Sequence, residues 1–179
     1  MNLPNKLTVL RVIMVPFFVF FMLWDGMGES GKYLAALLFI LASITDWLDG
    51  YLARRDHLVT DFGKFMDPIA DKLLVCSALI CLVEKQMLAG WIVIIIIGRE
   101  FIISGFRLVA SDKGVVIAAS YWGKFKTVSQ MLMVILMILD LGGAFDTITQ
   151  VLVWVALALT VISLADYLKK NWNVMEGGM

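Results

Sequence analysis

The chain is dominated by long apolar segments that are separated by short polar or glycine-containing connections. Each segment is close to the ~20 residues that a helix needs to cross a hydrocarbon core of about 30 Å. The apolar positions run on without the regular alternation of a membrane β-barrel strand. The pattern predicts six membrane-spanning helices, at 8–24, 33–53, 67–84, 89–110, 125–141 and 147–168.

Residues 1–11 differ from these segments because they are amphipathic and carry Lys6 and Arg11. We expect them to form a short interfacial segment that leads into the first span. A basic start followed by an apolar run also fits a cleaved signal peptide, but no cleavage site of the A-x-A kind follows. We therefore predict an uncleaved first helix.

Composition supports an integral membrane protein with an all-α fold. Of the 179 residues, 61% are hydrophobic and 17% are charged, and the mean hydropathy is +0.89. A soluble domain is about half apolar and about one quarter charged. In lipid, a helix satisfies its own backbone polar groups. Since no long polar linker interrupts the chain, we expect a single membrane domain over residues 1–179.

The distribution of basic residues predicts how the chain is oriented. With the N-terminus in the cytoplasm, 13 of the 15 Lys and Arg residues fall on the cytoplasmic side, and only Lys32 and Lys85 do not. The reverse orientation would break the positive-inside rule. We expect a multi-pass protein of the cytoplasmic membrane with both termini inside. The formal net charge of +0 gives no general basic field for nucleic acid.

Four aspartates lie where the second and third predicted spans meet the cytoplasm. Asp46 and Asp49 are three residues apart, and Asp67 and Asp71 are four apart, so each pair lies on one side of its helix. Carboxylates at a membrane edge are costly unless they are compensated, and hard divalent cations suit all-carboxylate ligands. The pattern favours a Mg²⁺ or Mn²⁺ site over a cluster of solvated helix-end carboxylates. Asp67 could also cap the third span, because Pro68 follows it.

The residues around these aspartates suit a phosphate-bearing ligand. Gly50, Ala53 and Gly63 lack bulk, so a ligand can approach the backbone closely. Arg54 could reach a phosphate. Two cations about 4 Å apart could clamp a phosphoryl group for in-line displacement, while a carboxylate that faces the incoming hydroxyl acts as general base.

A second set of residues could bind another phosphate: Arg11, Arg99, Arg107, Lys124 and Lys126. Arg99 and Arg107 are eight residues apart within one predicted span, and charges inside a membrane are functional candidates. The alternatives are an Arg99–Glu100 pair that holds helices together and simple interfacial anchoring by the lysines. Asn5 and Thr8 form a further polar set beside Arg11, for which ordinary interfacial polarity is the alternative.

The spacing Asp-x2-Asp-Gly-x2-Ala-Arg-x8-Gly-x3-Asp-x3-Asp, which runs from Asp46 to Asp71, resembles the signature of the CDP-alcohol phosphotransferases. The resemblance implies two divalent metal ions, Mg²⁺ or Mn²⁺, with Asp71 as the catalytic base. The implied metal ligands are Asp46, Asp49, Asp67 and Asp71. The residues that we assign to the CDP-lipid are Asn5, Thr8, Gly50, Ala53, Arg54 and Gly63.

Three further segments narrow the resemblance: Asn-Leu-Pro-Asn-x-Leu-Thr-x2-Arg over 2–11, Ile-Gly-Arg-Glu over 97–100, and Gly-Lys-Phe-Lys-Thr over 123–127. Together they resemble the bacterial branch that transfers a phosphatidyl group from CDP-diacylglycerol to sn-glycerol 3-phosphate and releases CMP. The resemblance also implies six helices around a cytoplasm-facing polar cavity and a homodimer surrounded by membrane lipid. A phosphate-bearing acceptor would be the ligand of the second set of residues, which is cationic.

Three alternatives remain open at this point. The same chemistry could use another acceptor, such as inositol phosphate, serine or phosphatidylglycerol. A divalent-cation transporter could line an ion path with the four carboxylates, although they lie at the cytoplasmic rim and not at the midplane. A membrane scaffold without chemistry would not need eight fixed positions.

Overall fold

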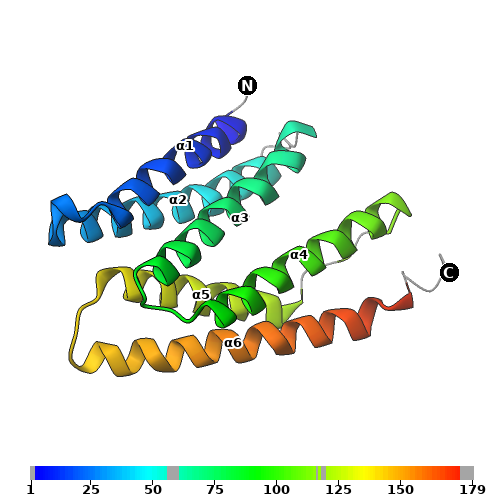
Figure 1. Cartoon of the computed structure of the whole chain (residues 1–179). Coiled ribbons are helices and arrows are strands. Elements are labelled where there is room, and N and C mark those ends of the chain that lie inside the picture. Colours follow the sequence, from blue (N-terminus) through cyan, green and yellow to red (C-terminus); the bar gives the residue numbers. More distant parts are fainter. Residues whose placement is uncertain (1–2, 56–60, 116, 118–119, 174–179) are drawn as a thin grey trace. The chain divides into compact units, whose positions relative to one another are not determined.

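The computed structural model describes residues 3–55, 61–115, 117 and 120–173, and these contain helices but no strand (Figure 1). Within the helices, side chains are not described at positions 3, 4, 47, 49, 50, 52–54, 61, 62, 64 and 65. The α-helices are α1 (Leu3–Leu23), α2 (Glu29–Arg55), α3 (Asp61–Glu84), α4 (Gly90–Asp112), α5 (Tyr121–Leu139) and α6 (Ala144–Asn171). A short 3₁₀ helix, η1 (Asp25–Met27), joins α1 to α2. The all-α prediction is therefore confirmed for the described residues.

The helices fall into two compact units. The first unit contains Met1–Leu88 together with Met137–Leu139. The second unit contains Ala89–Leu136 and Asp140–Met179. The expectation of a single domain over residues 1–179 stays a prediction.

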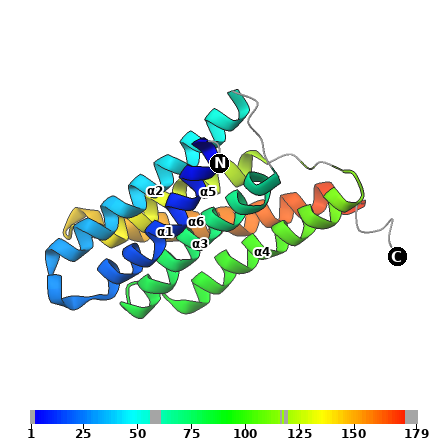
Figure 2. The same cartoon turned by 90° about the horizontal axis from the view of Figure 1, so that it is seen from above.

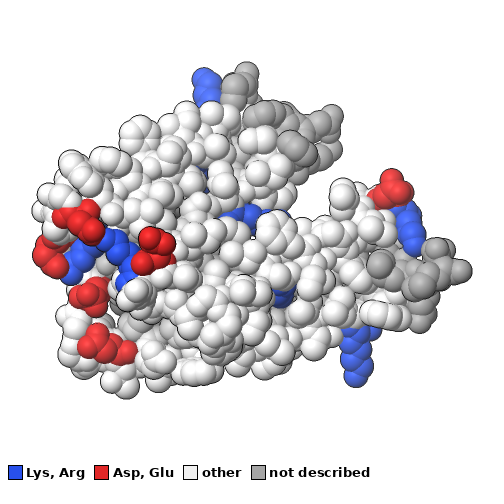
Figure 3. Space-filling view, in the orientation of Figure 1, with Lys and Arg blue, Asp and Glu red and all other residues white. Residues whose placement is uncertain are grey.

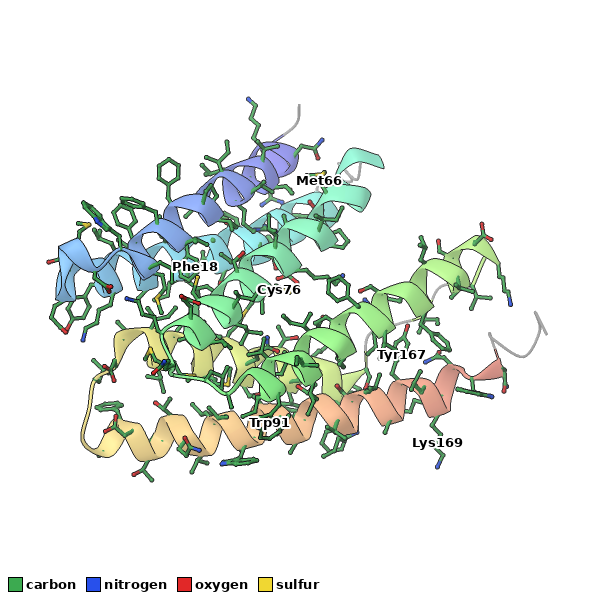
Figure 4. The ribbon with its side chains drawn as sticks, viewed as in Figure 1. Phe18, Met66, Cys76, Trp91, Tyr167 and Lys169 are labelled. Carbon is green, nitrogen blue, oxygen red and sulfur yellow. The ribbon has the colours of Figure 1, made fainter. Side chains whose placement is uncertain are left out.

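In the first unit, α1 packs against both α2 and α3 (Figures 1 and 2). The buried residues of α1 recur every three or four positions and so form one helix face; they are Asn5, Thr8, Arg11, Val15, Phe18 and Met22. Phe18 lies against Phe39 of α2 with 5.9 Å between the ring centroids (Figure 4). Ala35, Ala36 and Ala42 of α2 are also buried, and small side chains let helices approach closely.

Glycines shape the turn between α1 and α2. Gly28 has a φ of +53°, a conformation that glycine adopts without strain. Gly31 is buried, and a Cβ atom at this position would lie 3.0 Å from the carbonyl oxygen of Phe21. Acidic and basic side chains gather over this turn, where Lys85 pairs with Asp25 (Figure 3).

In the second unit, α4 packs along α6. Ile103 and Phe106 of α4 form a buried cluster with Tyr167 of α6, which lies between the two helices (Figure 4). The rings of Phe106 and Tyr167 meet edge to face with 6.0 Å between their centroids. Trp91 and Trp154 form a second pair of rings, with 6.2 Å between centroids, and both are exposed.

The surface and the helix lengths indicate a membrane protein. Within the described residues, three helical segments are long and apolar enough to cross a membrane: Asn5–Leu23, Tyr121–Leu139 and Ala144–Asn171. The apolar run of α4 is interrupted by Arg99, Glu100 and Arg107. Most of the face in Figure 3 carries no charged side chain. The prediction of six helices agrees with the six α-helices of the described residues, whereas six membrane spans stay a prediction.

Five of the helices begin three to six residues earlier than hydropathy predicts, and the difference is largest for α1 and α3. Residues 3–11 form the first turns of α1 and not a separate interfacial segment. The start of α3 at Asp61 places Asp67 and Pro68 inside the helix, so Asp67 is not its N-cap. Hydropathy detects the apolar part of a helix, and polar turns that extend the helix give no such signal.

Candidate functional site

In the first unit, the polar half of the buried face of α1 contacts the two acidic helices. The Thr8 hydroxyl donates a hydrogen bond to Oδ1 of Asp67 on α3, with 2.6 Å between the oxygens. Nη1 of Arg11 lies 2.7 Å from Oδ1 of Asp46 on α2. Thr8 and Arg11 are fully buried, and Asn5, one turn before Thr8, is nearly so. Thr8 and Arg11, three positions apart on α1, thus link this helix to α3 and α2 respectively.

This arrangement brings carboxylates from α2 and α3 close together. Asp46 and Asp67 lie near enough for each charge to act on the other. Asp71 is one turn after Asp67 on α3 and lies on the same side of the helix. Asp71 is half-buried, and Gly63, two turns before it, is buried.

Part of the predicted site lies outside the residues whose side chains are described. The α2 backbone runs through Asp49, Gly50, Ala53 and Arg54, but their side chains are outside the description. Among the described residues, no group of three or more His, Cys, Asp or Glu side chains could hold a metal ion. The predicted ligand set includes Asp49, whose side chain is outside the description, so the four-aspartate site stays a prediction.

The described carboxylates nevertheless have the chemistry that a divalent cation requires. Carboxylate oxygens are the ligands that Mg²⁺ and Mn²⁺ prefer. Arg11 offsets part of the negative charge at Asp46, and Thr8 orients the carboxylate of Asp67. Hydrogen bonds of this kind commonly fix metal-binding carboxylates. The residues present therefore fit a cation held between α2 and α3.

In the second unit, four polar residues form what we call the Glu100 cluster: Arg99 and Glu100 of α4, Lys126 of α5 and Ser163 of α6. Arg99 Nη1 lies 2.9 Å from Glu100 Oε1, and the Lys126 amine donates to the same oxygen. Arg99 Nε donates to the Ser163 hydroxyl at 3.1 Å. The cluster ties three helices together, and its two cations and one carboxylate leave an excess of positive charge.

The Glu100 cluster lies directly against α5. A Cβ atom on Gly123 would lie 3.4 Å from Nη2 of Arg99, which is ordinary van der Waals contact, so the guanidinium lies beside α5 at this glycine. Lys126 is only 3% exposed. Plain interfacial anchoring therefore does not describe Lys126. The Arg99–Glu100 pair, which was the alternative to phosphate binding by Arg99, is present.

The other two predicted cations of this unit lie elsewhere. The Arg107 guanidinium lies over the Tyr167 ring at 5.9 Å, and the Lys124 amine lies over the Tyr121 ring at 5.3 Å. Both cations are exposed, and within the described residues no ion pair links either to the Glu100 cluster. Eight residues advance a helix by about 12 Å, which separates Arg107 from Arg99.

Sequence reasoning missed two polar residues, Ser163 and Gln130. Ser163 accepts the hydrogen bond from Arg99. Gln130 is 2% exposed, and neither of its amide atoms has a hydrogen-bond partner among the described residues. Leaving such a group unpaired costs about 1–3 kcal/mol. The signal that could have found Gln130 is its position four residues after Lys126, on the same helix face.

The fold and these carboxylates define a helical membrane protein with an acidic site between two helices. Residues 1–162 match the model of the CDP-alcohol phosphatidyltransferase family. The chain is 45% identical to the CDP-diacylglycerol–glycerol-3-phosphate 3-phosphatidyltransferase of Bacillus subtilis, over 98% of this chain and 97% of that protein. It is 41% identical to the Haemophilus influenzae protein of the same name, over 94% of this chain and 92% of that protein.

A third relative is the probable phosphatidylglycerophosphate synthase of Mycobacterium tuberculosis, which is 41% identical over 98% of this chain and 84% of that protein. The chain therefore belongs to the CDP-alcohol phosphatidyltransferase family. This confirms the resemblance that the spacing from Asp46 to Asp71 indicated. Members of this family generally depend on divalent metal ions.

Proposed function

We propose that this chain transfers the phosphatidyl group of CDP-diacylglycerol to sn-glycerol 3-phosphate. The observation that carries the proposal is its identity to relatives named for this activity, which reaches 45% over 98% of the chain. The complete aspartate signature supports the same chemistry. The excess positive charge of the Glu100 cluster supports an acceptor that bears a phosphate.

The proposed reaction is a single displacement at phosphorus. A hydroxyl oxygen of sn-glycerol 3-phosphate attacks the β-phosphorus of CDP-diacylglycerol, and the bond from that phosphorus to the oxygen of CMP breaks. The hydroxyl proton passes to a carboxylate, which we assign to Asp71. The products are phosphatidylglycerophosphate and CMP.

We propose that Asp46, Asp49, Asp67 and Asp71 hold two divalent cations, Mg²⁺ or Mn²⁺. When bound, these cations neutralise charge on the diphosphate of the donor. The hydrogen bond from Thr8 to Asp67 and the ion pair of Arg11 with Asp46 support this role, because they orient and balance two of the carboxylates.

The remaining assignments follow the two polar sets. The proposed CDP-lipid ligands are Asn5, Thr8, Gly50, Ala53, Arg54 and Gly63. The proposed acceptor-phosphate ligands are Arg11, Arg99, Arg107, Lys124 and Lys126. Arg99 and Lys126 have the strongest support, because they share the half-buried carboxylate of Glu100 and retain excess positive charge. Arg11 already pairs with Asp46, which favours a role as counter-charge.

We also propose that the protein is a homodimer of the cytoplasmic membrane. Its active site and both termini would face the cytoplasm. This orientation is supported because it places 13 of the 15 basic residues on the cytoplasmic side.

The test is CMP release from CDP-diacylglycerol by purified protein in detergent. Release should require Mg²⁺ or Mn²⁺ together with sn-glycerol 3-phosphate. Inositol phosphate and serine are the competing acceptors. CMP release with one of these, but not with sn-glycerol 3-phosphate, would overturn the proposed acceptor. Absence of release from folded protein, with Mg²⁺ or Mn²⁺ flux into proteoliposomes, would favour the transporter instead.

Replacing Thr8 with valine should raise the metal concentration needed for half-maximal CMP release by about tenfold, because hydrogen bonds to metal ligands commonly change metal affinity by this factor or more. Valine keeps the shape of threonine but cannot donate to Asp67. The matched control is Thr160→Val, since Thr160 is equally buried and its hydroxyl donates to the backbone of its own helix. An unchanged metal requirement in Thr8→Val would contradict the role of Thr8.

A further inference from the structure

The buried face of α5 changes character along its length. Its residues follow the i, i+3, i+4, i+7 pattern of one helix face and are Lys126, Ser129, Gln130, Met133, Val134, Met137 and Ile138. The first three are polar and the others are apolar. A helix that only needs to pack would carry apolar side chains throughout this face. The polar half therefore requires a reason beyond packing.

Two of the three polar residues have partners that explain them. The Lys126 amine donates to Glu100, and the Ser129 hydroxyl donates to the backbone carbonyl of Lys126 at 3.0 Å. Gln130 differs, because its amide nitrogen and oxygen are both buried without a partner among the described residues. Buried polar atoms in native proteins are paired with the protein or with ordered water. A ligand that binds beside Gln130 and displaces such water would supply the same hydrogen bonds.

The position of Gln130 indicates what that molecule carries. Gln130 lies one helical turn after Lys126, about 6 Å along the axis and on the same face. Lys126 belongs to the Glu100 cluster, whose excess positive charge suits a phosphate. A glutamine amide both donates and accepts hydrogen bonds, as a hydroxyl group does, whereas a phosphate oxygen only accepts. The combination fits a phosphorylated polyol.

We propose that Gln130 binds the hydroxyl of the acceptor that does not react, which in sn-glycerol 3-phosphate is the hydroxyl on C2. Gln130 then selects a polyol phosphate over a simple alcohol phosphate and positions the terminal hydroxyl that attacks. This inference rests on the proposed function and adds to it a specificity-determining residue.

The test compares two acceptors, sn-glycerol 3-phosphate and 3-hydroxypropyl phosphate, which keeps the phosphate and the terminal hydroxyl but lacks the hydroxyl on C2. The wild-type protein should prefer sn-glycerol 3-phosphate in kcat/KM. In Gln130→Met, kcat/KM for sn-glycerol 3-phosphate should fall by about tenfold, as expected for the loss of one or two hydrogen bonds. For 3-hydroxypropyl phosphate, the kcat/KM of Gln130→Met should stay within about twofold of the wild-type value, so the variant loses the preference for sn-glycerol 3-phosphate.

Controls separate this role from a structural one. Ser129→Ala removes a buried hydroxyl from the same face and should keep the wild-type preference. Thermal unfolding of Gln130→Met should occur at the wild-type temperature or above it, because the Gln130 amide makes no hydrogen bond to a described residue that the change could remove. Gln130→Asn, which retracts the amide by one methylene, should also lose the preference and replaces Gln130→Met if that variant does not fold.

A wild-type preference that persists in both Gln130 variants would overturn the inference while the proposed function stands. Equal use of the two acceptors by the wild-type protein would overturn it as well. Failure of the wild-type protein to release CMP with either acceptor would instead overturn the proposed function.

Discussion

Replacing Asp71 with asparagine is expected to lower the rate of CMP release by about 10²–10⁴-fold while the protein stays folded. Asparagine has the size of aspartate but cannot take the proton of the attacking hydroxyl. The helix should tolerate the change because Asp71 is half-buried and lies in the interior of α3. The rate at saturating substrates and the unfolding temperature in detergent are the two measurements.

The same variant distinguishes a base from a metal ligand. If Asp71 served only to hold a cation, raising the Mg²⁺ or Mn²⁺ concentration would restore much of the rate, whereas loss of the base is not restored. Asp140→Asn is the matched control, since Asp140 is exposed at the end of α5 with a φ of +44°, a conformation that asparagine tolerates well. Near-normal turnover in Asp71→Asn would show that another group is the base.

Replacing Arg11 with methionine is expected to lower the free energy of unfolding by about 2–4 kcal/mol. The Arg11 side chain is fully buried, and its removal leaves Asp46 without the cation 2.7 Å away. This decrease in the free energy of unfolding is smaller than for a fully buried ion pair, because 34% of the Asp46 side chain is exposed and water can solvate it. Chemical unfolding in detergent measures the change.

Two further variants show whether the lost stability comes from the ion pair. Arg11→Met/Asp46→Leu should regain most of it, since no unpaired charge remains. Lys170→Met breaks the exposed pair with Asp166, in which the charged atoms lie 2.7 Å apart, and should leave stability nearly unchanged. Wild-type stability in Arg11→Met, with only a raised KM for sn-glycerol 3-phosphate, would favour the acceptor-phosphate role instead.

Much of the fold could be predicted from the sequence, because apolar runs of membrane length have few structural solutions in lipid. All six predicted segments overlap helices of the structure. The helix ends were less predictable, as the early start of α3 at Asp61 shows. Residues 61–66 read Asp-Phe-Gly-Lys-Phe-Met, so charged residues and a glycine interrupt the apolar ones, and such a mixed turn does not stand out as part of a long apolar run.

The candidate site was predictable to the extent that it depends on local spacing. The intervals between Asp46, Asp49, Asp67 and Asp71 indicated the family, which the comparisons confirm. Spacing places Arg107 about 12 Å along the helix from Arg99, but it could not show which groups the two guanidinium groups contact. Those partners, Tyr167 for Arg107 and Ser163 for Arg99, come from α6.

The sequence by itself determined the class of protein, the helices and the family, since these follow from periodicity, composition and intervals along one chain. The tertiary structure decided which charges meet: Arg11 with Asp46, and Lys126 with Glu100. It also decided that Gln130 is buried with no hydrogen-bond partner among the residues that the structure describes. Such pairings depend on how separate helices pack, and no interval along the chain encodes the distance between two helices.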